Sequence, residues 1–419
     1  MRFFHVSDLH LGKSLRGYDL LDDQSFILER IAAAIALRKP DALLIAGDIY
    51  DRAVPPVEAV QLFDRFLASA RSAGTANMAI AAIPGNHDSG GRLSFGAALL
   101  AQTGLHIAVR ADAEPVVLRG NDGTPCALWA LPFLNQANAP WEEWAREART
   151  REEGFLEARG LGDAGEPGAA GPRVRSQEEM LRLALGRIKP RLAQNDRNVI
   201  MAHCFAAGSR VSESETGFIG AAEQVDAGLF ADFDYAALGH LHGCQSPGAG
   251  IWYSGAPLAY GISEAEEERG YIEVNLEEGN CRVEFVRLVP KRKIRRISGD
   301  FEDLLEQATA DKGRDDYVEF YLLDQEAVIN AAERLKSLYP RLLSVRQRAF
   351  EISSGGEPGE DEEDSPPCDA REARDAGDSL DRAKADFAAF YREMKDSEPS
   401  EKELSLFADL AKEASDASL

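Results

Sequence analysis

The chain has 419 residues, of which 44% are hydrophobic and 28% are charged, so it is long enough for two or three domains with filled cores. Its net charge of −24 and pI near 4.8 lower the expectation of a nucleic-acid ligand without excluding one, because bound divalent cations reverse the local field. The five cysteines form no Cys-x-x-Cys pair, there is no secretory leader, and no apolar run approaches ~18–20 residues. These features argue against a disulfide framework, a zinc ribbon and a membrane partner, and predict a cytoplasmic protein.

Three short apolar segments in the first 110 residues each end in a polar cluster. Strands are expected over 3–7, 42–46 and 78–83, with amphipathic helical segments between them. The clusters that follow these strands are Asp8-Leu9-His10, Gly47-Asp48-Ile49-Tyr50-Asp51 and Gly85-Asn86-His87-Asp88. This alternation predicts a mostly parallel sheet covered by helices, in which ligands bind beyond the carboxyl ends of the strands.

The part from 111 to 290 is less regular but contains two more clusters. Buried strands expected over 198–202 and 235–238 lead into His203 and into Gly239-His240-Leu241-His242. The other expected elements are strands at 115–118 and 126–131, helices near 140–157 and 177–192, and a Gly-rich loop at 160–171. Three further segments (252–255, 271–276 and 281–289) are expected to form antiparallel strands that close a second sheet.

The basic run Lys291–Arg296 marks a boundary. Its cations could follow a DNA backbone, but a solvated connector between domains is the favoured interpretation. We expect a small α/β capping domain over 291–352, an acidic linker over 353–368, and C-terminal helices over 369–419. Residues 291–419 hold 32 acidic and 20 basic residues, a net charge of −12, so much of the acidity lies outside the part that carries the polar clusters.

Together the five clusters offer enough oxygen and imidazole ligands for two metal ions, with one carboxylate as a bridge. Such ligands suit Mn, Fe or Zn rather than Ca. Two ions ~3.5–4 Å apart can activate a hydroxide and stabilise both oxygens of a displacement at phosphorus. The glycines before Asp48, Asn86 and His240 are expected to let the backbone turn sharply at the strand ends.

Each cluster also has a purely structural interpretation. Asp-x-His occurs by chance, Gly-Asp is often only a turn, and Asn-His-Asp could cap a helix. His203 could be a hydrogen-bonded core histidine, and His240 and His242 could lie on two faces of a strand end. In this order and after these strands, the clusters favour a metal site. His5 and His106 belong to no cluster and are interpreted as structural.

The chain resembles the calcineurin-like metallophosphoesterase superfamily over residues 1 to about 290. Around the motifs it is most similar to the SbcD family, the nuclease subunits of bacterial SbcC–SbcD exonucleases. The residues that carry this resemblance are Asp8–Leu15 with Gly17-Tyr18 and Asp23-Gln24, Ala46–Asp51 with Pro55-Pro56, Gly85–Ser89 with Arg92-Leu93, and Tyr253–Pro257. It implies an α/β sandwich of two facing mixed β-sheets flanked by helices, a nuclease domain over 1–290, the small cap and the helical tail.

The resemblance also implies roles for individual residues. One metal would be held by Asp8, His10, Asp48 and His242, and the other by Asp48, Asn86, His203 and His240, with Asp48 as the bridge. His87 would face the scissile phosphate and stabilise or protonate the leaving oxygen, which suits an imidazole. Asp88 would either orient His87 or cap the following helix.

Substrate contacts are less specific. Lys13, Arg16 and Arg92 lie close to the metal-bearing loops and could contact phosphates, or be surface charges at loop ends. Asp51 stands where some family members have a histidine, which puts a substrate contact there in doubt. Gly90-Gly91 also departs from the family pattern before Arg92, which loosens the expected loop.

The resemblance implies a Mn²⁺-dependent DNA nuclease with 3′–5′ exonuclease activity on duplex ends and endonuclease activity on single strands. Its implied partners are an SbcC-type SMC-like ATPase and a second copy of the chain, within a heterotetramer that acts in DNA end processing. The homodimer contact would involve helices at 56–72 and 92–101, and the C-terminal helices would hold the partner's coiled coil. The same core could instead hydrolyse a small-molecule or protein phosphoester. A third alternative, a scaffold without activity, is disfavoured because every expected ligand and His87 are present.

Overall fold

The computed structural model describes residues 1–112, 114–120, 123–158, 174, 176–192, 197–210, 224–277 and 280–349. All of them belong to the first of two compact units, Met1–Asp361. The expected linker, the C-terminal helices and the Gly-rich loop at 160–171 lie outside the described residues.

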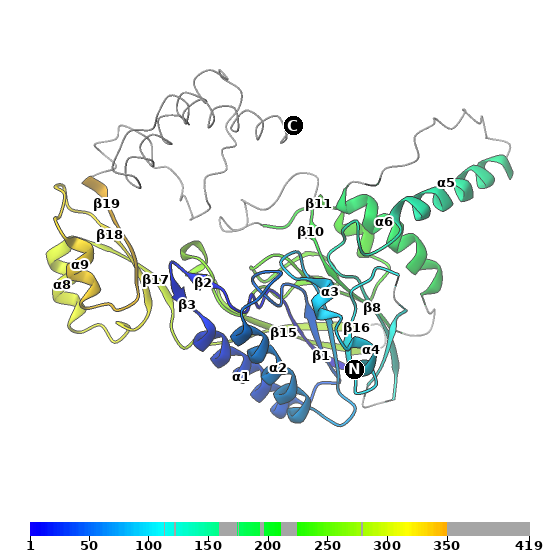
Figure 1. The fold of residues 1–419 in the computed structure, drawn as a ribbon, viewed down its shortest axis with the longest axis horizontal. Coiled ribbons are helices and arrows are strands. Elements are labelled where there is room, and N and C mark those ends of the chain that lie inside the picture. Colours follow the sequence, from blue (N-terminus) through cyan, green and yellow to red (C-terminus); the bar gives the residue numbers. More distant parts are fainter. Residues whose placement is uncertain are drawn as a thin grey trace, which may run out of the picture. The chain divides into compact units, whose positions relative to one another are not determined.

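The first sheet contains the N-terminal strands (Figure 1). Its order is β16 (Asn280–Arg287), β15 (Gly270–Glu277), β1 (Arg2–Val6), β4 (Ala42–Ala46), β5 (Ala79–Ile83), β6 (Leu105–Ile107). Strands β1, β4, β5 and β6 are parallel, as their alternation with helices predicts. Strand β15 pairs antiparallel with both β1 and β16. The expectation that β15 and β16 close the second sheet is therefore wrong: they extend the first sheet past β1.

The second sheet contains the strands from the middle of the chain. Its order is β13 (Gln245–Gly248), β14 (Ile251–Tyr253), β12 (Tyr235–Gly239), β9 (Arg197–His203), β8 (Pro125–Ala130), β7 (Val116–Arg119). Strands β14, β12, β9 and β8 are parallel, and the two edge strands are antiparallel to their neighbours. The fold is thus the expected pair of mixed sheets flanked by helices.

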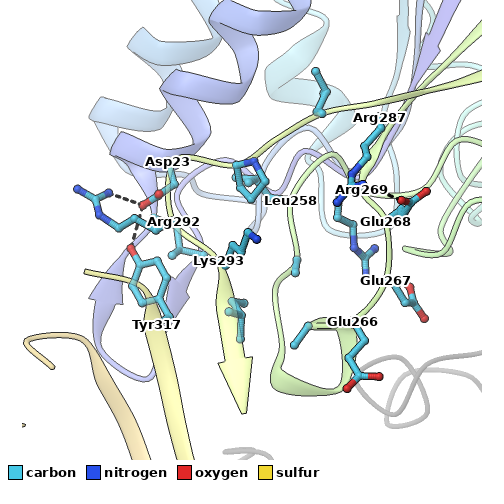
Figure 2. A pocket seen from close by; sticks show the side chains of 16 residues that line it. Asp23, Leu258, Glu266, Glu267, Glu268, Arg269, Arg287, Arg292, Lys293 and Tyr317 are labelled. Atoms are coloured by element: carbon cyan, nitrogen blue, oxygen red, sulfur yellow. Dashed lines mark hydrogen bonds and ion pairs between the residues drawn. The ribbon is translucent and has the colours of Figure 1, made fainter. Parts of the chain in front are cut away.

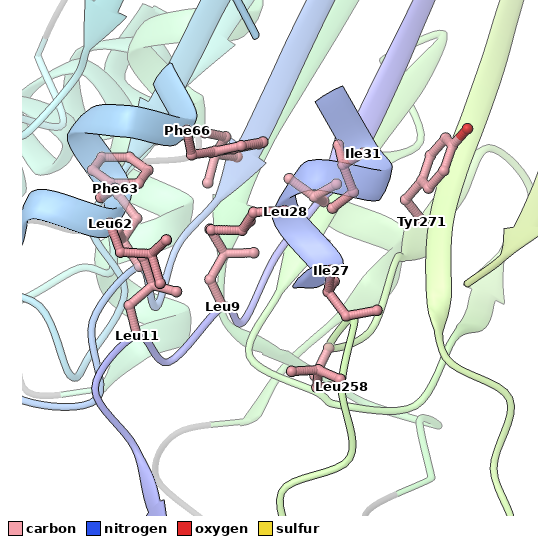
Figure 3. Close-up of a cluster of buried hydrophobic side chains, with 14 of the residues drawn as sticks. Leu9, Leu11, Ile27, Leu28, Ile31, Leu62, Phe63, Phe66, Leu258 and Tyr271 are labelled. Carbon is pink, nitrogen blue, oxygen red and sulfur yellow. The ribbon is translucent and has the colours of Figure 1, made fainter. Parts of the chain in front are cut away.

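The central strands of both sheets are buried on both faces, which explains why they are almost continuously apolar. Side chains that alternate along β1 and β4 separate into two clusters: Phe4, Val6, Leu43 and Ile45 contact the helices, whereas Phe3 and Leu44 face Val199 and Met201 of the second sheet. The helices on the outer face of the first sheet are α1 (Leu21–Arg38) and α2 (Val57–Ala73). Figure 3 shows their apolar side chains directed into one cluster with Leu9. Each such fully buried side chain contributes about 1.5–3 kcal/mol to stability.

Shorter elements complete the core. On the outer face of the second sheet, α6 (Gln177–Ile188) begins with a capping box made by Ser176 and Glu179 and packs with Trp141 and Trp144 of α5 (Trp141–Ala158). The remaining pieces are β2 (Ser14–Leu15), β3 (Tyr18–Asp19), α3 (Gly90–Leu93), α4 (Ala97–Ala101), β10 (Phe205–Ala206), β11 (Gln224–Val225) and the 3₁₀ turns Lys189–Arg191, Ala227–Phe230 and Ile262–Glu264.

The capping segment is a small α/β unit with three strands, one more than the two (317–323 and 342–350) that its sequence predicts. Its parallel strands, in order, are β17 (Ile294–Gly299), β18 (Tyr317–Leu322) and β19 (Leu342–Gln347), with α8 (Phe301–Ala308) and α9 (Ala331–Lys336) between them. Residues 294–296 lie in β17, whereas 291–293 lie in the connection between β16 and β17, so the interpretation of the basic run as a solvated connector is wrong for its second half.

Candidate metal centre

The five polar clusters meet at one edge, where β1, β4, β5, β9 and β12 end. Two backbone hydrogen bonds fix the first loop on the second: Asp8 N donates to Gly47 O and His10 N donates to Asp48 O, each at 3.0 Å. Asp8, His10, Asp48 and His203 are buried. The strand ends thus bring together side chains that are more than 200 residues apart in the sequence.

The backbone at this edge is strained. Seven of the described non-glycine residues have a positive φ, and four of them belong to the clusters: Asp8 (53°), His10 (41°), Asp48 (47°) and His240 (110°). Non-glycine residues in such conformations cost roughly 1–3 kcal/mol each and collect at functional sites. The surrounding core therefore holds these side chains in orientations that a relaxed loop would not give them.

The sequence suggests that the glycines before Asp48, Asn86 and His240 allow sharp turns, but two of them are needed for another reason. Gly47 does turn, with φ +93°, but Gly85 and Gly239 have no positive φ. A Cβ at Gly85 would lie 2.1 Å from Asp48 Oδ1, and one at Gly239 would lie 1.9 Å from Ala46 O. These two glycines are required by the close approach of neighbouring strand ends and not by a turn.

Asp48 is central to the cluster. Its Oδ2 lies 3.4 Å from His203 Nε2 and 3.7 Å from His10 Nε2. On one side, His10 Nε2 is 3.2 Å from His242 Nε2. On the other, Asn86 Oδ1 is 3.0 Å from His203 Nε2 and 3.1 Å from His240 Nδ1.

These separations fit two metal ions. Two imidazole nitrogens bound to one ion at ~2.0–2.1 Å lie roughly 2.9–3.4 Å apart. The 3.2 Å between the Nε2 atoms of His10 and His242 falls in this range. The ligand atoms of Asp8, His10 and His242 lie within 4.8 Å of one another, as do those of Asp8, Asp48 and His203. The residues present therefore suit divalent metals.

His87 lies beside the predicted ligands. One of its ring nitrogens is close enough to His10 and Asp48 to complete a third group of that kind. Its Nδ1 is 3.0 Å from the carbonyl oxygen of Asp51, and its backbone N–H donates to Asp48 Oδ1 at 2.9 Å. A carbonyl oxygen can only accept, so the proton of a neutral His87 lies on Nδ1.

Asp88 stabilises the loops and does not cap the next helix, whose N-cap residue is Ser89. Its carboxylate accepts hydrogen bonds from the backbone N–H groups of Ile49, Tyr50 and Gly85, each at 2.9 Å. These bonds tie the loop after β4 to the loop after β5. The helix-capping alternative for Asp88 is therefore wrong, because its oxygens are engaged by backbone donors.

The expected substrate contacts separate into two groups. Asp51 Oδ1 accepts a hydrogen bond from Lys13 Nζ at 3.0 Å and lies 3.6 Å from His10 Nδ1, so both residues belong to the site. Arg16 lies in the turn between β2 and β3, and Arg92 lies in α3; both are exposed. Substrate contacts by these residues stay a prediction.

Glu264 is a buried carboxylate of the site that no sequence pattern predicted. Its Oε1 lies 2.8 Å from His242 Nδ1, and its Oε2 lies 3.0 Å from Arg269. It lies 22 residues after His242, in a 3₁₀ turn with no recognisable motif. No local signal in the sequence points to it.

Burial and charge set the protonation of the cluster. Burial lowers the pKa of His10 to about 4 and that of His240 to about 3, so both are neutral, as metal ligands must be. Burial alone would lower the pKa of His203, but the carboxylates of Asp48 and Asp8 raise it to about 9. Burial raises the pKa of Asp8 to about 6. Burial alone would raise the pKa of Asp48, but the neighbouring His203 and His10 hold it well below the usual range of a carboxyl group.

Four of the five cations of the basic run form ion pairs with carboxylates. Lys291 pairs with Asp22, Arg292 with Asp22, Asp23 and Asp315, Arg295 with Asp311 and Asp316, and Arg296 with Glu319. A DNA backbone would have to displace these carboxylates. The interpretation of the run as a phosphate track is disfavoured for that reason.

His5 is the buried structural histidine that we expected. Its ring nitrogens lie 3.0 Å from Tyr235 Oη and 3.1 Å from Leu238 O, and burial lowers its pKa to about 3. Cys126, Cys204, Cys244 and Cys281 are all free thiols. No helix among the described residues is both long and apolar enough to cross a membrane.

Comparison with known proteins identifies two sequence families. The model of the calcineurin-like phosphoesterase family matches residues 1–244. A second model, described as the Type 5 capsule protein repressor C-terminal domain, matches residues 290–393. The chain is 28% identical over 362 residues to the D subunit of the SbcCD nuclease of Staphylococcus saprophyticus subsp. saprophyticus, a match that covers 84% of this chain and 86% of the relative.

Solved structures give a weaker likeness. The protein TT1561 of Thermus thermophilus aligns over 68% of this chain and 99% of its own, with 14% identity and a TM-score of 0.36. A dimetal phosphatase from Danio rerio aligns over 68% and 96%, with 11% identity and a TM-score of 0.37. At these TM-scores the likeness to both structures is weak.

Proposed function

Because the chain belongs to the calcineurin-like phosphoesterase family, a family of phosphoester hydrolases, we propose that it is a metal-dependent DNA nuclease subunit. It would act as a 3′–5′ exonuclease on duplex ends and as an endonuclease on single strands. The curated relative named as a nuclease subunit, matched over 84% of the chain, supports a nucleic acid as the substrate. The observation that carries the proposal is the position of Asp48 Oδ2 between His203 and His10, at 3.4 and 3.7 Å.

The proposed ligand sets follow from these distances. Asp8, His10 and His242 would hold one ion and Asn86, His203 and His240 the other, with Asp48 shared. The mixed oxygen and imidazole donors suit Mn, Fe or Zn, and the resemblance to the SbcD family favours Mn²⁺. Two such ions would supply an activated water and neutralise charge on the phosphate. The Ala46 carbonyl, 2.9 Å from His203 Nδ1, favours the tautomer with Nε2 directed to the ion.

His87 is the proposed acid at the leaving oxygen. In its imidazolium form, with Nδ1–H donating to the Asp51 carbonyl, His87 would pass the proton on its other nitrogen to the leaving oxygen as the bond to phosphorus breaks, and would be left neutral with its proton on Nδ1. Lys13, held by Asp51, lies where it would attract a phosphate of the substrate. Arg16, Arg92 and Asp51 itself remain proposed substrate contacts, and Asp88 positions the loop that bears His87.

The proposed partners are DNA, a second copy of the chain and an SbcC-type SMC-like ATPase, in the cytoplasm. A dimer is supported by large exposed apolar side chains near α2, α3 and α4: Val54, Val57, Phe95 and Leu99. The ATPase is proposed because the relative's name places it in an SbcCD complex. The tail expected to bind that ATPase, 369–419, lies outside the described residues.

Cleavage of end-labelled linear duplex DNA in Mn²⁺ tests the proposal. We expect stepwise loss of the ends by the wild-type protein. His87→Ala should lower the rate roughly 10²–10⁴-fold while two Mn²⁺ ions remain bound, because this range is typical of a lost general acid. A small phosphodiester is assayed in parallel. If DNA stays intact even with an SbcC-type ATPase present while the small ester is hydrolysed, the nuclease proposal is wrong and a small-substrate phosphoesterase replaces it.

A further inference from the structure

The side chain of Glu264 is completely buried behind the metal centre. Its Oε1 accepts a hydrogen bond from His242 Nδ1 at 2.8 Å, and its Oε2 accepts one from the backbone N–H of Tyr260 at 2.9 Å. A carboxylate is acceptor-only, so His242 carries its proton on Nδ1 and directs the lone pair of Nε2 toward His10.

Arg269 contacts both Glu264 and His242. One terminal nitrogen lies 3.0 Å from Glu264 Oε2, and the other donates to the backbone carbonyl of His242. Its side chain is only 6% exposed, so the pair is a desolvated ion pair with fixed geometry. His242 is thus held at two points: Glu264 contacts the Nδ1 of its ring, and Arg269 contacts its backbone carbonyl.

We infer that Glu264 and Arg269 are positioning residues that make the ion beside His242 the more tightly bound of the two. This inference rests on the proposed function, because it takes His242 as a ligand. A carboxylate behind a ligating imidazole fixes the ring and raises its basicity, and losing it typically costs 10–100-fold in metal affinity. On the other side of Asp48, His203 Nδ1 meets the neutral Ala46 carbonyl.

Arg269 also connects the metal centre to the junction between core and cap. It lines a pocket of about 150 Å³ together with Asp23, Leu258, Arg292 and Tyr317 (Figure 2). Glu267 also lines this pocket and forms a second ion pair with Arg269, at 2.9 Å, but its side chain is 46% exposed. The same guanidinium therefore has one buried carboxylate partner that contacts a proposed ligand and one exposed partner that does not.

This difference supplies a matched control. Glu264→Gln and Glu267→Gln each remove one negative charge beside Arg269 without changing side-chain size. Mn²⁺ is titrated into each metal-free full-length variant, and bound ions are counted from the electron paramagnetic resonance signal of free Mn²⁺. Thermal unfolding of the metal-free proteins is followed in parallel. Asn86→Ala, which removes a proposed ligand of the other ion only, serves as a reference.

We expect the wild type to bind two ions in separate steps. Glu264→Gln should weaken the tighter step 10–100-fold and leave the weaker step unchanged. Asn86→Ala should do the reverse, and Glu267→Gln should match the wild type. Arg269→Lys keeps the charge but loses the fork, so it should weaken the tighter step as well.

Two results would overturn the inference: wild-type affinities for both ions in Glu264→Gln, or equal weakening of both ions with a lower unfolding temperature, which would make the pair merely structural. If Glu264→Gln does not fold, Arg269→Lys decides by the same criterion. A wild-type protein that binds no Mn²⁺ would instead contradict the proposed function itself, so the two failures are distinguishable.

Discussion

The two halves of the metal centre use similar ligands but have different support. His10 and His242 lie next to the carboxylates of Asp51 and Glu264, at 3.6 and 2.8 Å. His203 lies against a carbonyl oxygen, and His240 Nδ1 lies 3.1 Å from Asn86, itself a proposed ligand. A carboxylate favours a basic, well-oriented imidazole more strongly than a neutral oxygen does. Two sites with nearly the same donors are therefore expected to bind metal with different strengths.

The largest effect is expected from a substitution that disrupts both halves of the metal centre. Asp48→Asn takes away the one carboxylate that both halves share, and we expect both Mn²⁺ steps to weaken at least ~100-fold, beyond the cost of losing a supporting residue. DNA cleavage should disappear with them. Isothermal titration with Mn²⁺ checks this, and a variant that loses only one ion would contradict the assignment of Asp48 as the bridge.

A backbone change should act on both halves through Asp48. In Gly85→Ala the new Cβ would meet Asp48 Oδ1 at 2.1 Å and its backbone nitrogen at 2.4 Å, so the loops must separate. Overpacking of this kind costs about 1–3 kcal/mol, which thermal unfolding would detect, and both Mn²⁺ steps should weaken. Gly91→Ala is the control, because a Cβ there meets nothing within 4 Å. Equal behaviour of the two variants would show that close packing at Gly85 is unimportant.

The two halves should also respond differently to pH. Because the pKa of His203 is raised to about 9, this ring is protonated in the metal-free protein at neutral pH, and an ion can bind there only by displacing the proton. Affinity on the His203 side should thus rise up to about tenfold per pH unit between about pH 7 and 9. Burial lowers the pKa of His10 to about 4, so this ring is already neutral at pH 7. The affinity of the His10 side for Mn²⁺ should therefore change little at neutral pH and above. Mn²⁺ titrations across this range test it, and parallel slopes for both steps would contradict it.

The smallest expected effect lies on the better-supported half. Asp51→Asn removes the carboxylate near His10 Nδ1 but leaves Glu264 in place behind His242. We expect roughly tenfold weaker binding of the tighter ion, at the low end of the range for lost supporting residues. Lys13 also loses its ion pair, so the Michaelis constant for DNA should change as well. An unchanged Mn²⁺ titration would leave Asp51 only a role toward Lys13.

Local patterns predicted the parts of the fold that depend on one segment at a time. The strand expected over 42–46 has those bounds in the structure, and the polar clusters lie at strand ends, as parallel βα units require. Pairing between distant strands was harder: β15 and β16 have ordinary alternating sequences, and nothing local tells which sheet they join. Strand β17 was hidden because two consecutive cations of the basic run, Arg295 and Arg296, lie within it and interrupt the alternation of apolar and polar residues.

The same limit applies to the site. The clusters identify the candidate ligands because those residues adjoin strand ends, but the support behind them comes from elsewhere in the chain. Glu264 and Arg269 reach His242 through a folded loop, and Gly85 and Gly239 are needed by atoms on other strands. The ligand assignments themselves stay predictions until the titrations are done.

The left-handed backbone at Asp8, His10 and Asp48 has an evolutionary consequence. Each of these residues occupies a conformation that glycine or asparagine adopts at lower cost. A gene copy released from selection for catalysis would gain stability by accepting those residues there. Descendants that lost the activity should therefore show glycine or asparagine at these positions before their core strands diverge, so the strain leaves a record of whether a lineage still uses its metal centre.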